Sequence, residues 1–189
     1  VPAYGLASGA FAAAAIAGLA FALTVSLSRG YLTVALALTA LGTAYVSSLR
    51  NIPLLRPVVT VIGAIVAARM AWDPRIMAEG VGRTPIFNWL LIGYGVPAAA
   101  FYASARVLEQ RASDLAVRIC DSLAVLFTAL LAFLEIRHLT NDGDIFHPAV
   151  RHIEAGLMTL TSILMSFSLA RLDIARRNPV FATAALIAG

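Results

Sequence analysis

The sequence predicts an all-α fold, a polytopic transmembrane helix bundle with about six full spans and the start of a seventh. Of the 189 residues, 60% are hydrophobic and only 13% are charged, whereas a soluble domain has about 25% charged residues. The mean hydropathy is +0.86, so there is more apolar surface than a chain of this length can bury in one aqueous core. The apolar residues also fall into runs of roughly 20, enough to cross a hydrocarbon core about 30 Å thick.

Seven apolar runs follow one another along the chain. The first is rich in Ala and Gly, the second follows the tight turn Ser28-Arg29-Gly30, and the third opens with Pro57, which suits the first turn of a helix. A polar segment with two prolines and two glycines, residues 73–85, separates the third run from the fourth. The predicted spans are residues 3–27, 31–49, 57–72, 86–108, 115–139 and 148–172, and a seventh run begins at 180.

The connections between these runs are short, so successive helices should be antiparallel neighbours in an up-and-down bundle. No internal repeat and no stretch with the composition of a soluble domain interrupts the series. We therefore expect residues 1–189 to form a single transmembrane bundle. Because the seventh run stops at Gly189, far short of a full span, we expect the chain to be a fragment of a longer multi-span protein.

All 14 basic residues are arginines, and they lie singly or in pairs between the apolar runs. A nucleic-acid-binding protein would gather such charge on one face, so the pattern excludes nucleic acid as a partner and indicates the lipid bilayer. The alternation of spans places more arginines on one side, which favours that side as cytoplasmic. The first side has Arg50, Arg56, Arg106, Arg111, Arg118, Arg171, Arg176 and Arg177; the second has Arg29, Arg69, Arg75, Arg83, Arg137 and Arg151.

The fifth run has charges near both ends, where they are costly in a membrane. Thirteen uncharged residues separate Asp121 from Glu135, which is about 20 Å of helix and less than the thickness of the hydrocarbon core. Asp121, Thr128 and Glu135 are seven residues apart and share one helical face. They predict a polar stripe that faces a cavity or a proton path. The alternative is that the charges are neutralised anchors at the membrane edge.

Partners for these carboxylates are available within the same helix. Arg118 lies one turn from Asp121, and His138 lies one turn from Glu135, so each carboxylate can form a local ion pair. Glu154 lies near the start of the sixth run, where a carboxylate suits the positive end of the helix dipole. The residues predicted as possible functional positions are Arg118, Asp121, Thr128, Glu135, Arg137, His138 and Glu154.

The three histidines of the chain, His138, His147 and His152, lie within or beside the loop after the fifth run. Imidazoles and carboxylates are ligands of zinc. However, the spacing matches no HExxH or His-x3-His ligand set, and Asn141-Asp142-Gly143-Asp144 is first a turn signal. The sequence therefore predicts no metal site and no cofactor, and it contains no P-loop, GxSxG or dinucleotide-binding turn.

Gly93, Gly95 and Pro97 predict a kink in the fourth run. Proline removes the hydrogen bond to the carbonyl of Gly93, and its ring clashes there. Broken helices of this kind line binding sites in transporters, but prolines also bend spans for packing alone. Both interpretations stay open.

Several motifs carry a resemblance to a known family. They are Arg69-Met70-Ala71-Trp72-Asp73-Pro74-Arg75, the Asn-x4-Gly-Tyr-Gly-x-Pro pattern from Asn88 to Pro97, Glu135-Ile136-Arg137-His138 and, more loosely, Glu154-Ala155-Gly156-Leu157. From about 57 to 172 the chain resembles the bacterial predicted multi-pass membrane proteins known as domain of unknown function 2339. The resemblance implies a longer parent with many more spans, often preceded by a coiled coil. It implies no reaction, so no catalytic residue is carried over, and the soluble N-terminal part of the family is missing from this sequence.

We expect an integral protein of the bacterial inner membrane that is not an enzyme. The leading hypothesis is a scaffold or transporter-like bundle whose partners are the lipid bilayer and the remaining spans of the parent protein. The alternative is a membrane-embedded enzyme that acts on a lipid-linked substrate through Glu135, His138, His147 or His152 at the membrane surface. That alternative requires at least two of these side chains to converge within hydrogen-bond reach. The sequence does not identify a small-molecule substrate.

Overall fold

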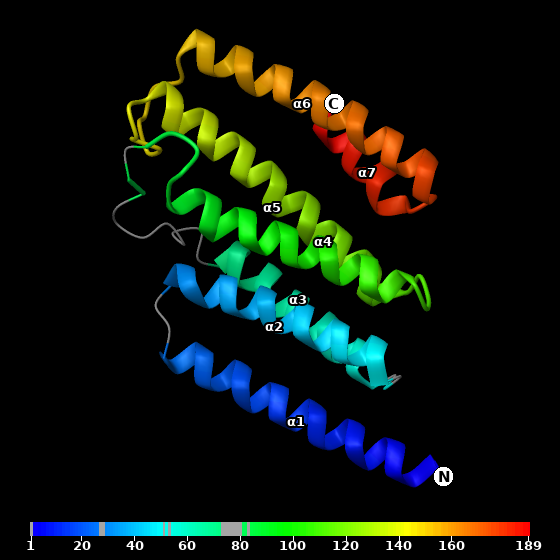
Figure 1. Cartoon of the computed structure of the whole chain (residues 1–189). Helices are drawn as coiled ribbons and strands as arrows, with labels where there is room; N and C mark the ends of the chain where they lie inside the picture. Colours follow the sequence, from blue (N-terminus) through cyan, green and yellow to red (C-terminus); the bar gives the residue numbers. More distant parts are fainter. Residues whose placement is uncertain (1, 27–28, 51, 53, 73–80, 83) are drawn as a thin grey trace.

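The computed structural model describes residues 2–26, 29–50, 52, 54–72, 81–82 and 84–189. Within these ranges the ordered elements are all helices, which confirms the predicted fold class. The long helices run back and forth as antiparallel neighbours (Figure 1). The elements are α1 (Pro2–Ser26), α2 (Arg29–Arg50), α3 (Leu55–Trp72), the π-helical turn η1 (Leu91–Gly95), α4 (Val96–Glu109), α5 (Leu115–Thr140), α6 (His152–Arg176) and α7 (Pro179–Ala188).

Among the described residues, five helical segments are long and apolar enough to cross a membrane. They correspond to the second to sixth predicted spans. The first and seventh predicted runs are also helical, with shorter apolar stretches at Ala7–Leu23 and Pro179–Ala188. The five segments are Gly30–Leu49, Leu55–Trp72, Leu91–Glu109, Leu115–Thr140 and His152–Arg176.

The fourth span begins later than predicted. Residues 84–88 form bends rather than helix, and helical structure starts at Trp89. The reason is the side chain of Asn88, whose Oδ1 accepts a hydrogen bond from the backbone N–H of Leu90 at 2.7 Å. An asparagine that binds a backbone N–H two residues ahead starts a helix in the manner of an N-cap.

The sixth span is also displaced, from the predicted 148–172 to His152–Arg176. The guanidinium of Arg137 donates hydrogen bonds to the carbonyl oxygens of Ile145 and His147. These contacts hold the chain before α6 in an irregular path. Arg151 keeps an extended conformation, with φ −79° and ψ 150°, and the helix begins after it.

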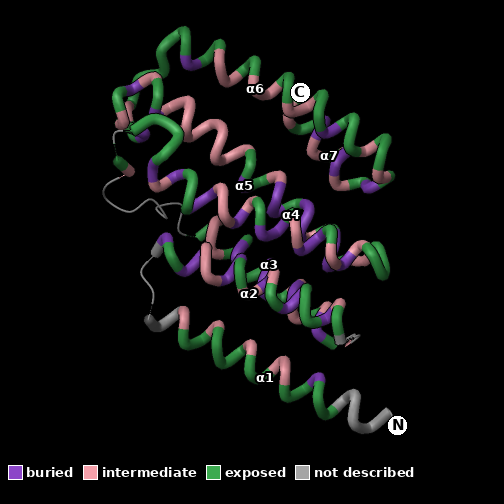
Figure 2. The backbone as a smooth tube through the Cα atoms, in the orientation of Figure 1, coloured by how far each residue is buried: buried purple, intermediate pink, exposed green. Residues whose placement is uncertain are grey.

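The core lies where α4 packs against both α2 and α5. The α2 surface at this contact has the small side chains Ala37, Ala40 and Ala44, all fully buried, and small residues let membrane helices approach closely. Phe101 of α4 stacks on Phe127 of α5 with ring centroids 6.0 Å apart. Figure 2 shows buried positions concentrated on these central helices, whereas α1 and α6 are mostly exposed.

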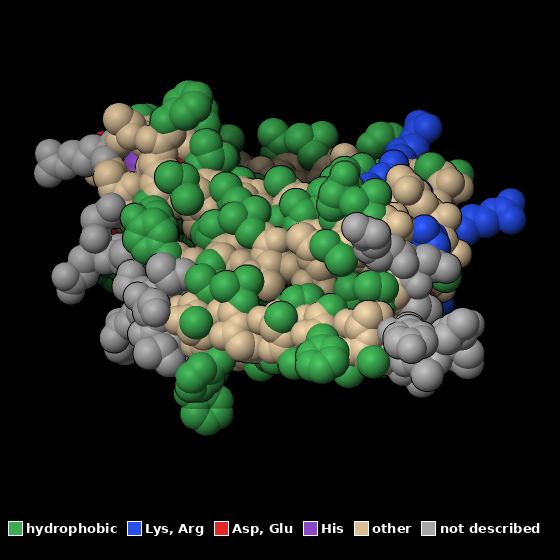
Figure 3. Space-filling model, turned by 60° about the horizontal axis from the view of Figure 1, so that its bottom comes forward, with side chains coloured by type: hydrophobic (Ala, Val, Ile, Leu, Met, Phe, Trp, Pro, Cys, Tyr) green, Lys and Arg blue, Asp and Glu red, His purple; other side chains and the backbone are tan. Residues whose placement is uncertain are grey.

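The outside of the bundle is apolar. Large side chains such as Phe11, Ile163 and Phe167 are more than half exposed, and hydrophobic side chains cover much of the face seen in Figure 3. Such a surface matches a lipid environment, in which apolar side chains need no burial and the helices satisfy their own backbone hydrogen bonds.

Helix α6 lies at the edge of the bundle, against α5 and α7. Only Glu154 and Leu169 of its residues are buried. Helix α7 runs back along α6, and Leu169 forms a small second core with Phe181 and Ala185 of α7. The α6–α7 hairpin is therefore attached to the rest of the bundle by few apolar contacts.

We predict that Gly63→Ala destabilises the contact between α3 and α5. A Cβ atom at Gly63 would lie 2.6 Å from Cγ2 of Ile119 and 3.3 Å from Cδ1 of Leu123, so the helices would have to separate. Overpacking of this kind costs about 1–3 kcal/mol, which thermal unfolding in detergent would detect as a lower Tm. Gly42→Ala is the matched control, because nothing lies within 4 Å of a Cβ at that position. An equal Tm for the two variants would contradict the prediction.

Candidate functional site

In the part of the chain that the structure describes, two clusters of polar side chains lie toward the two ends of α5. We call the end where α2, α4 and α6 finish the arginine-rich end, and the opposite end the loop end. The Arg176 cluster, toward the arginine-rich end, consists of Glu109, Asp121, Arg176 and Asn178. The loop-end cluster consists of Asn88, Glu135, Arg137, His138, Asn141 and Glu154.

The Arg176 cluster joins four helices around a buried arginine. Arg176 Nη2 lies 2.6 Å from Glu109 Oε2 of α4, and its Nη1 lies 3.4 Å from Asp121 Oδ1 of α5. The other oxygen of Asp121 accepts a hydrogen bond from Asn178 Nδ2 at 2.6 Å, and Asn178 also caps α7 by accepting from Val180 N–H. The Asp121 side chain is 0% exposed and that of Arg176 is 8% exposed, so this is a desolvated ion pair.

The predicted local pair between Arg118 and Asp121 is wrong. Arg118 is exposed on the surface of α5, whereas Asp121 is directed into the bundle toward Arg176 and Asn178. A carboxylate that is removed from water needs donors that are removed with it. The junction of α6 and α7 supplies these donors, and an exposed arginine on the same helix does not.

Asp114 and Arg56 form a second contact at the arginine-rich end, between the loop before α5 and the first turn of α3. Arg56 Nε lies 2.6 Å from Asp114 Oδ2, while Asp114 Oδ1 accepts from Val117 N–H and caps α5. The hydrogen bond from the Arg56 guanidinium is the main reason why the pKa of the Asp114 carboxyl lies below its ordinary value. Asp114 therefore both starts α5 and ties it to α3.

At the loop end, Glu135 is bound to the segment before α4. Its Oε2 accepts a hydrogen bond from Asn88 Nδ2 at 3.1 Å and a longer one from the backbone N–H of Ile86 at 3.4 Å. Ile86 has φ +67°, a left-handed conformation that is strained for a β-branched residue. The Glu135 carboxylate thus contacts the strained position and also orients Asn88, which starts the helix.

His138 contacts the same segment, not Glu135, so the predicted local pair between them is wrong. Its Nε2 lies 2.7 Å from the carbonyl oxygen of Gly82. Because a carbonyl only accepts, Nε2 is the donor. The imidazole is 2% exposed. Glu135 and His138 therefore bind two points of the connection before α4, Asn88 and Gly82, to the end of α5.

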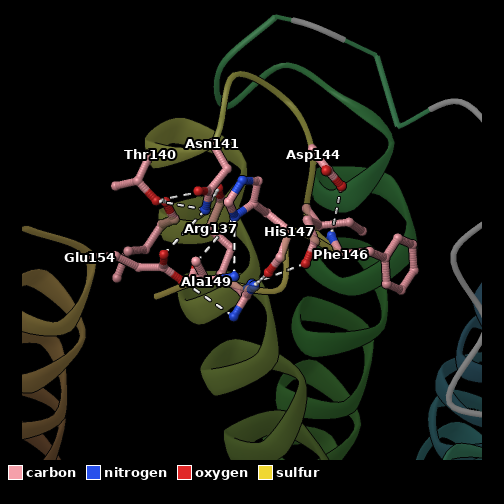
Figure 4. A network of polar contacts seen from close by, with 10 residues as sticks. Arg137, Thr140, Asn141, Asp144, Phe146, His147, Ala149 and Glu154 are labelled. Atoms are coloured by element: carbon pink, nitrogen blue, oxygen red, sulfur yellow. Dashed lines mark hydrogen bonds and ion pairs between the residues drawn. The ribbon is translucent and has the colours of Figure 1, made fainter. Parts of the chain in front are cut away.

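Arg137 organises the other loop, between α5 and α6 (Figure 4). Besides the carbonyl oxygens of Ile145 and His147, its guanidinium contacts Glu154 Oε1 at 3.3 Å. Asn141 Nδ2 donates to Glu154 Oε2 at 3.2 Å. Glu154 is wholly buried, so Arg137 supplies the counter-charge and Asn141 the hydrogen-bond donor for a desolvated carboxylate at the start of α6.

The predicted stripe on α5 divides between two surroundings. Asp121 and Thr128 both line a cavity of about 660 Å³ beside Gly95, and the Thr128 hydroxyl donates to the carbonyl of Ala124 in its own helix. Glu135 lies in the loop-end cluster instead. The three residues share a helical face, but the described contacts place only two of them on the cavity.

The predicted kink coincides with η1. Gly93 and Gly95 lie in this π-helical turn, which ends just before Pro97. Pro97 is buried, and Gly93 packs closely on the Trp89 ring, since a Cβ atom at Gly93 would lie 3.3 Å from Nε1 of Trp89. Single π turns often occur at functional sites, and this one borders the cavity through Leu91 and Gly95.

The histidines do not gather into a catalytic arrangement in the described contacts. His138 binds Gly82, His147 Nδ1 accepts from the N–H of Ala149 within its own loop, and His152 is exposed at the start of α6. Within the part of the chain that the structure describes, no three His, Cys, Asp or Glu side chains lie close enough to hold a metal ion. The convergence that the enzyme hypothesis requires is not present among these contacts.

A family model described as "Predicted membrane protein (DUF2339)" matches residues 2–189. The chain belongs to the DUF2339 family. No curated protein and no solved structure matches it. With its apolar helices, this DUF2339 chain is a multi-pass membrane protein, and a lipid bilayer is its environment.

The geometry explains why two motifs of this DUF2339 chain belong together. The Asn-x4-Gly-Tyr-Gly-x-Pro motif begins with Asn88, and the Glu-x-Arg-His motif begins with Glu135, so the hydrogen bond between these side chains joins the two motifs directly. Three polar residues of the second motif bind two different loops. The Glu-x-Arg-His motif therefore holds the two loops at the loop end against the end of α5.

Three participants of the Arg176 cluster were missed from the sequence of the DUF2339 chain: Glu109, Arg176 and Asn178. Asn178 precedes a proline and a new apolar run, which is the signal of a helix N-cap. Glu109 and Arg176 are charges near helix ends, and such residues are ordinarily read as solvated. Only the packing of α6 and α7 on α5 reveals that they surround Asp121.

We predict that Asp114→Asn reduces stability at neutral pH but not in acid. Because the folded-state pKa of Asp114 is lowered, the contribution of its charge is complete above the unfolded pKa and is lost as the pH falls through the folded value. The difference in Tm between wild type and variant should therefore shrink as the pH falls below about 3.9. Asparagine still caps the helix, so Asp114→Ala is the comparison that also removes the cap. A difference that stays constant from about pH 6 to about pH 3 would contradict the assignment.

We predict that Arg137→Met destabilises the bundle by about 3–5 kcal/mol, because it leaves the buried Glu154 without its counter-charge. The double variant Arg137→Met, Glu154→Leu should recover much of that loss, since it removes both charges. Chemical unfolding in mixed micelles measures both values, and limited proteolysis reports release of the 141–151 loop. Equal stability of the single and double variants would show that the pair is not the source of the effect.

Proposed function

We propose that this DUF2339 chain is a non-enzymatic membrane scaffold, a helix bundle whose polar residues hold helices and loops in place. The observation that carries the proposal is the use of its intramembrane carboxylates. Asp121, Glu135 and Glu154 each accept a hydrogen bond from a side chain on a different helix or loop. These hydrogen bonds join one structural element to another.

Glu109 adds to this support. It binds Arg176 of α6 at 2.6 Å and Arg106 of its own helix at 3.3 Å. The acid groups therefore link α6 to α4 and α5, a contact that apolar packing alone holds weakly. In the low dielectric of a membrane such paired charges are expensive to separate. A scaffold gains from this because the arrangement of its helices becomes specific.

The proposal includes the setting. The natural location would be a bacterial inner membrane. The arginine-rich end would face the cytoplasm, because arginines are in excess at that end. The partners would be lipid and the remaining spans of a longer parent protein. The apolar outer faces of α1 and α6, with Phe11 and Phe167 exposed, suit contact with either.

Transport is the second candidate, and one observation favours it. Asp121 and Thr128 line the cavity of about 660 Å³ beside η1, and interrupted helices line binding sites in transporters. A proton or solute pathway would use these two side chains. Asp121 is already bound to Arg176 and Asn178, which is why the scaffold has the better support.

The deciding experiment measures proton flux in proteoliposomes that contain a pH-sensitive dye and are driven by a potassium diffusion potential. The scaffold proposal predicts the same rate as in protein-free vesicles for the wild type and for Asp121→Asn and Thr128→Val. It also predicts that Asp121→Asn lowers the Tm, since a buried charge pair is broken, while Thr128→Val does not. Flux above background that is abolished by Thr128→Val, in a protein of unchanged Tm, would replace the scaffold with the transporter.

A further inference from the structure

A groove follows α5 between α4 and α6. Its wall on η1 and α4 includes the small residues Gly95 and Ala99, its floor includes Ala124 and Thr128, and its volume is about 660 Å³. Most of the lining is apolar. Because Gly95 and Ala99 lack bulky side chains, α4 and α6 leave a space that the protein itself does not fill.

The groove has the length of one bilayer leaflet. Along its floor it extends from Asp121 to Leu131, about 15 Å at about 1.5 Å per residue. This is half of a hydrocarbon core about 30 Å thick. On α6, the lining residues fall between Met165 and Leu172, in the half of the helix that leads to the arginine-rich end. The space therefore suits a single acyl chain that enters from the leaflet on that side.

The mouth of the groove carries an amphipathic ring and guanidinium groups. Tyr102 lines the groove and is 46% exposed. The guanidinium carbons of Arg106 and Arg176 lie 5.5 Å and 5.8 Å from the centre of its ring. Tyrosine is enriched at the level of lipid headgroups, where one end of the ring is apolar and the other is wet.

The charge of the protein is concentrated at this end. The formal net charge is +4, and all of it is accounted for by the arginine-rich end, with eight arginines against the four carboxylates Glu109, Asp114, Asp121 and Asp173. Arg176 is bound to two of these carboxylates. Arg106 contacts Glu109 at 3.3 Å, but at 48% exposure it is half exposed beside Tyr102. Arg118 and Arg177 are exposed at the same end. The arginines at one end of the molecule are visible in Figure 3.

From the groove and the charge together, we infer that this DUF2339 chain binds one anionic phospholipid. An acyl chain lies in the groove between α4 and α6, and the phosphate accepts hydrogen bonds from Arg106, in the field of the neighbouring arginines. A second protein helix would match the apolar groove but would bring no anion to the half-exposed guanidinium of Arg106. The inference holds whether the bundle is a scaffold or a transporter, because it concerns a site for lipid and not movement of a solute.

The test uses native mass spectrometry of the whole chain, stripped of lipid and then titrated with dioleoyl phosphatidylglycerol or dioleoyl phosphatidylcholine. We expect one phosphatidylglycerol to stay bound per chain, with tighter binding than phosphatidylcholine and a larger rise in Tm. Arg106→Gln should weaken phosphatidylglycerol binding about fivefold, the effect of one charge worth about 1 kcal/mol near a lipid surface. Ala99→Phe should weaken binding of both lipids, because the new ring fills the groove. Inorganic phosphate alone should not raise the Tm.

Two matched variants control for charge and for bulk. Arg171→Gln removes the same charge at the same end, but Arg171 lies over Phe167, which is not a groove residue, so binding should hardly change. Ala64→Phe adds the same ring to an exposed position on α3 and should also have little effect. Equal affinity for the two lipids, or equal losses from Arg106→Gln and Arg171→Gln, would overturn the assigned phosphate position. Lipid binding unaffected by Ala99→Phe, or a dimer that excludes lipid from the groove, would overturn the site.

Discussion

A carboxylate that lies in a hydrocarbon layer needs a hydrogen-bond donor that lies there too, and the arrangement of this bundle depends on that constraint. Asp121 and Glu154 are wholly buried, and their guanidinium partners, Arg176 and Arg137, come from the facing helix in each case. Helices α5 and α6 are consequently joined near both ends by reciprocal pairs: each helix provides one acid and one arginine. Between these two fixed points apolar packing is sparse, and the groove of about 660 Å³ occupies the space.

The fold could be predicted from the sequence because each span depends on the composition of its own segment. A run of about 20 apolar residues is a span whatever its neighbours are, and the described helices agree with those runs. The start of the sixth helix was misplaced for a different reason. Residues 148–151 are apolar enough to be helical by composition, but Arg137 holds the preceding carbonyls of Ile145 and His147 in an irregular path. That information lies in another helix and not in the segment itself.

The candidate site was predictable in its residue types but not in its contacts. Helical spacing shows that Arg118 is within reach of Asp121, yet it cannot show that Asp121 is directed toward Arg176, 55 residues away in the chain. In the same way, Asn88 and Glu135 are separated by 47 residues, so their hydrogen bond has no local signature. The resemblance to the family did mark both motifs. It did not indicate that Asn88 of one motif is hydrogen-bonded to Glu135 of the other.

The sparse burial of α6 has a consequence for how the protein is assembled. The α6–α7 hairpin has its own small core in Leu169, Phe181 and Ala185, and it meets the α2–α4–α5 core mainly through charged groups at its two ends. These few apolar contacts predict that the hairpin is a separate cooperative unit of lower stability. During insertion the central helices can complete their packing first, while Asp121 does not yet have its hydrogen-bond donors. Docking of the α6–α7 hairpin then pairs Asp121 with Arg176 and Arg137 with Glu154 in one step. Before docking, the chain therefore differs from the folded protein by an unpaired charge inside the membrane.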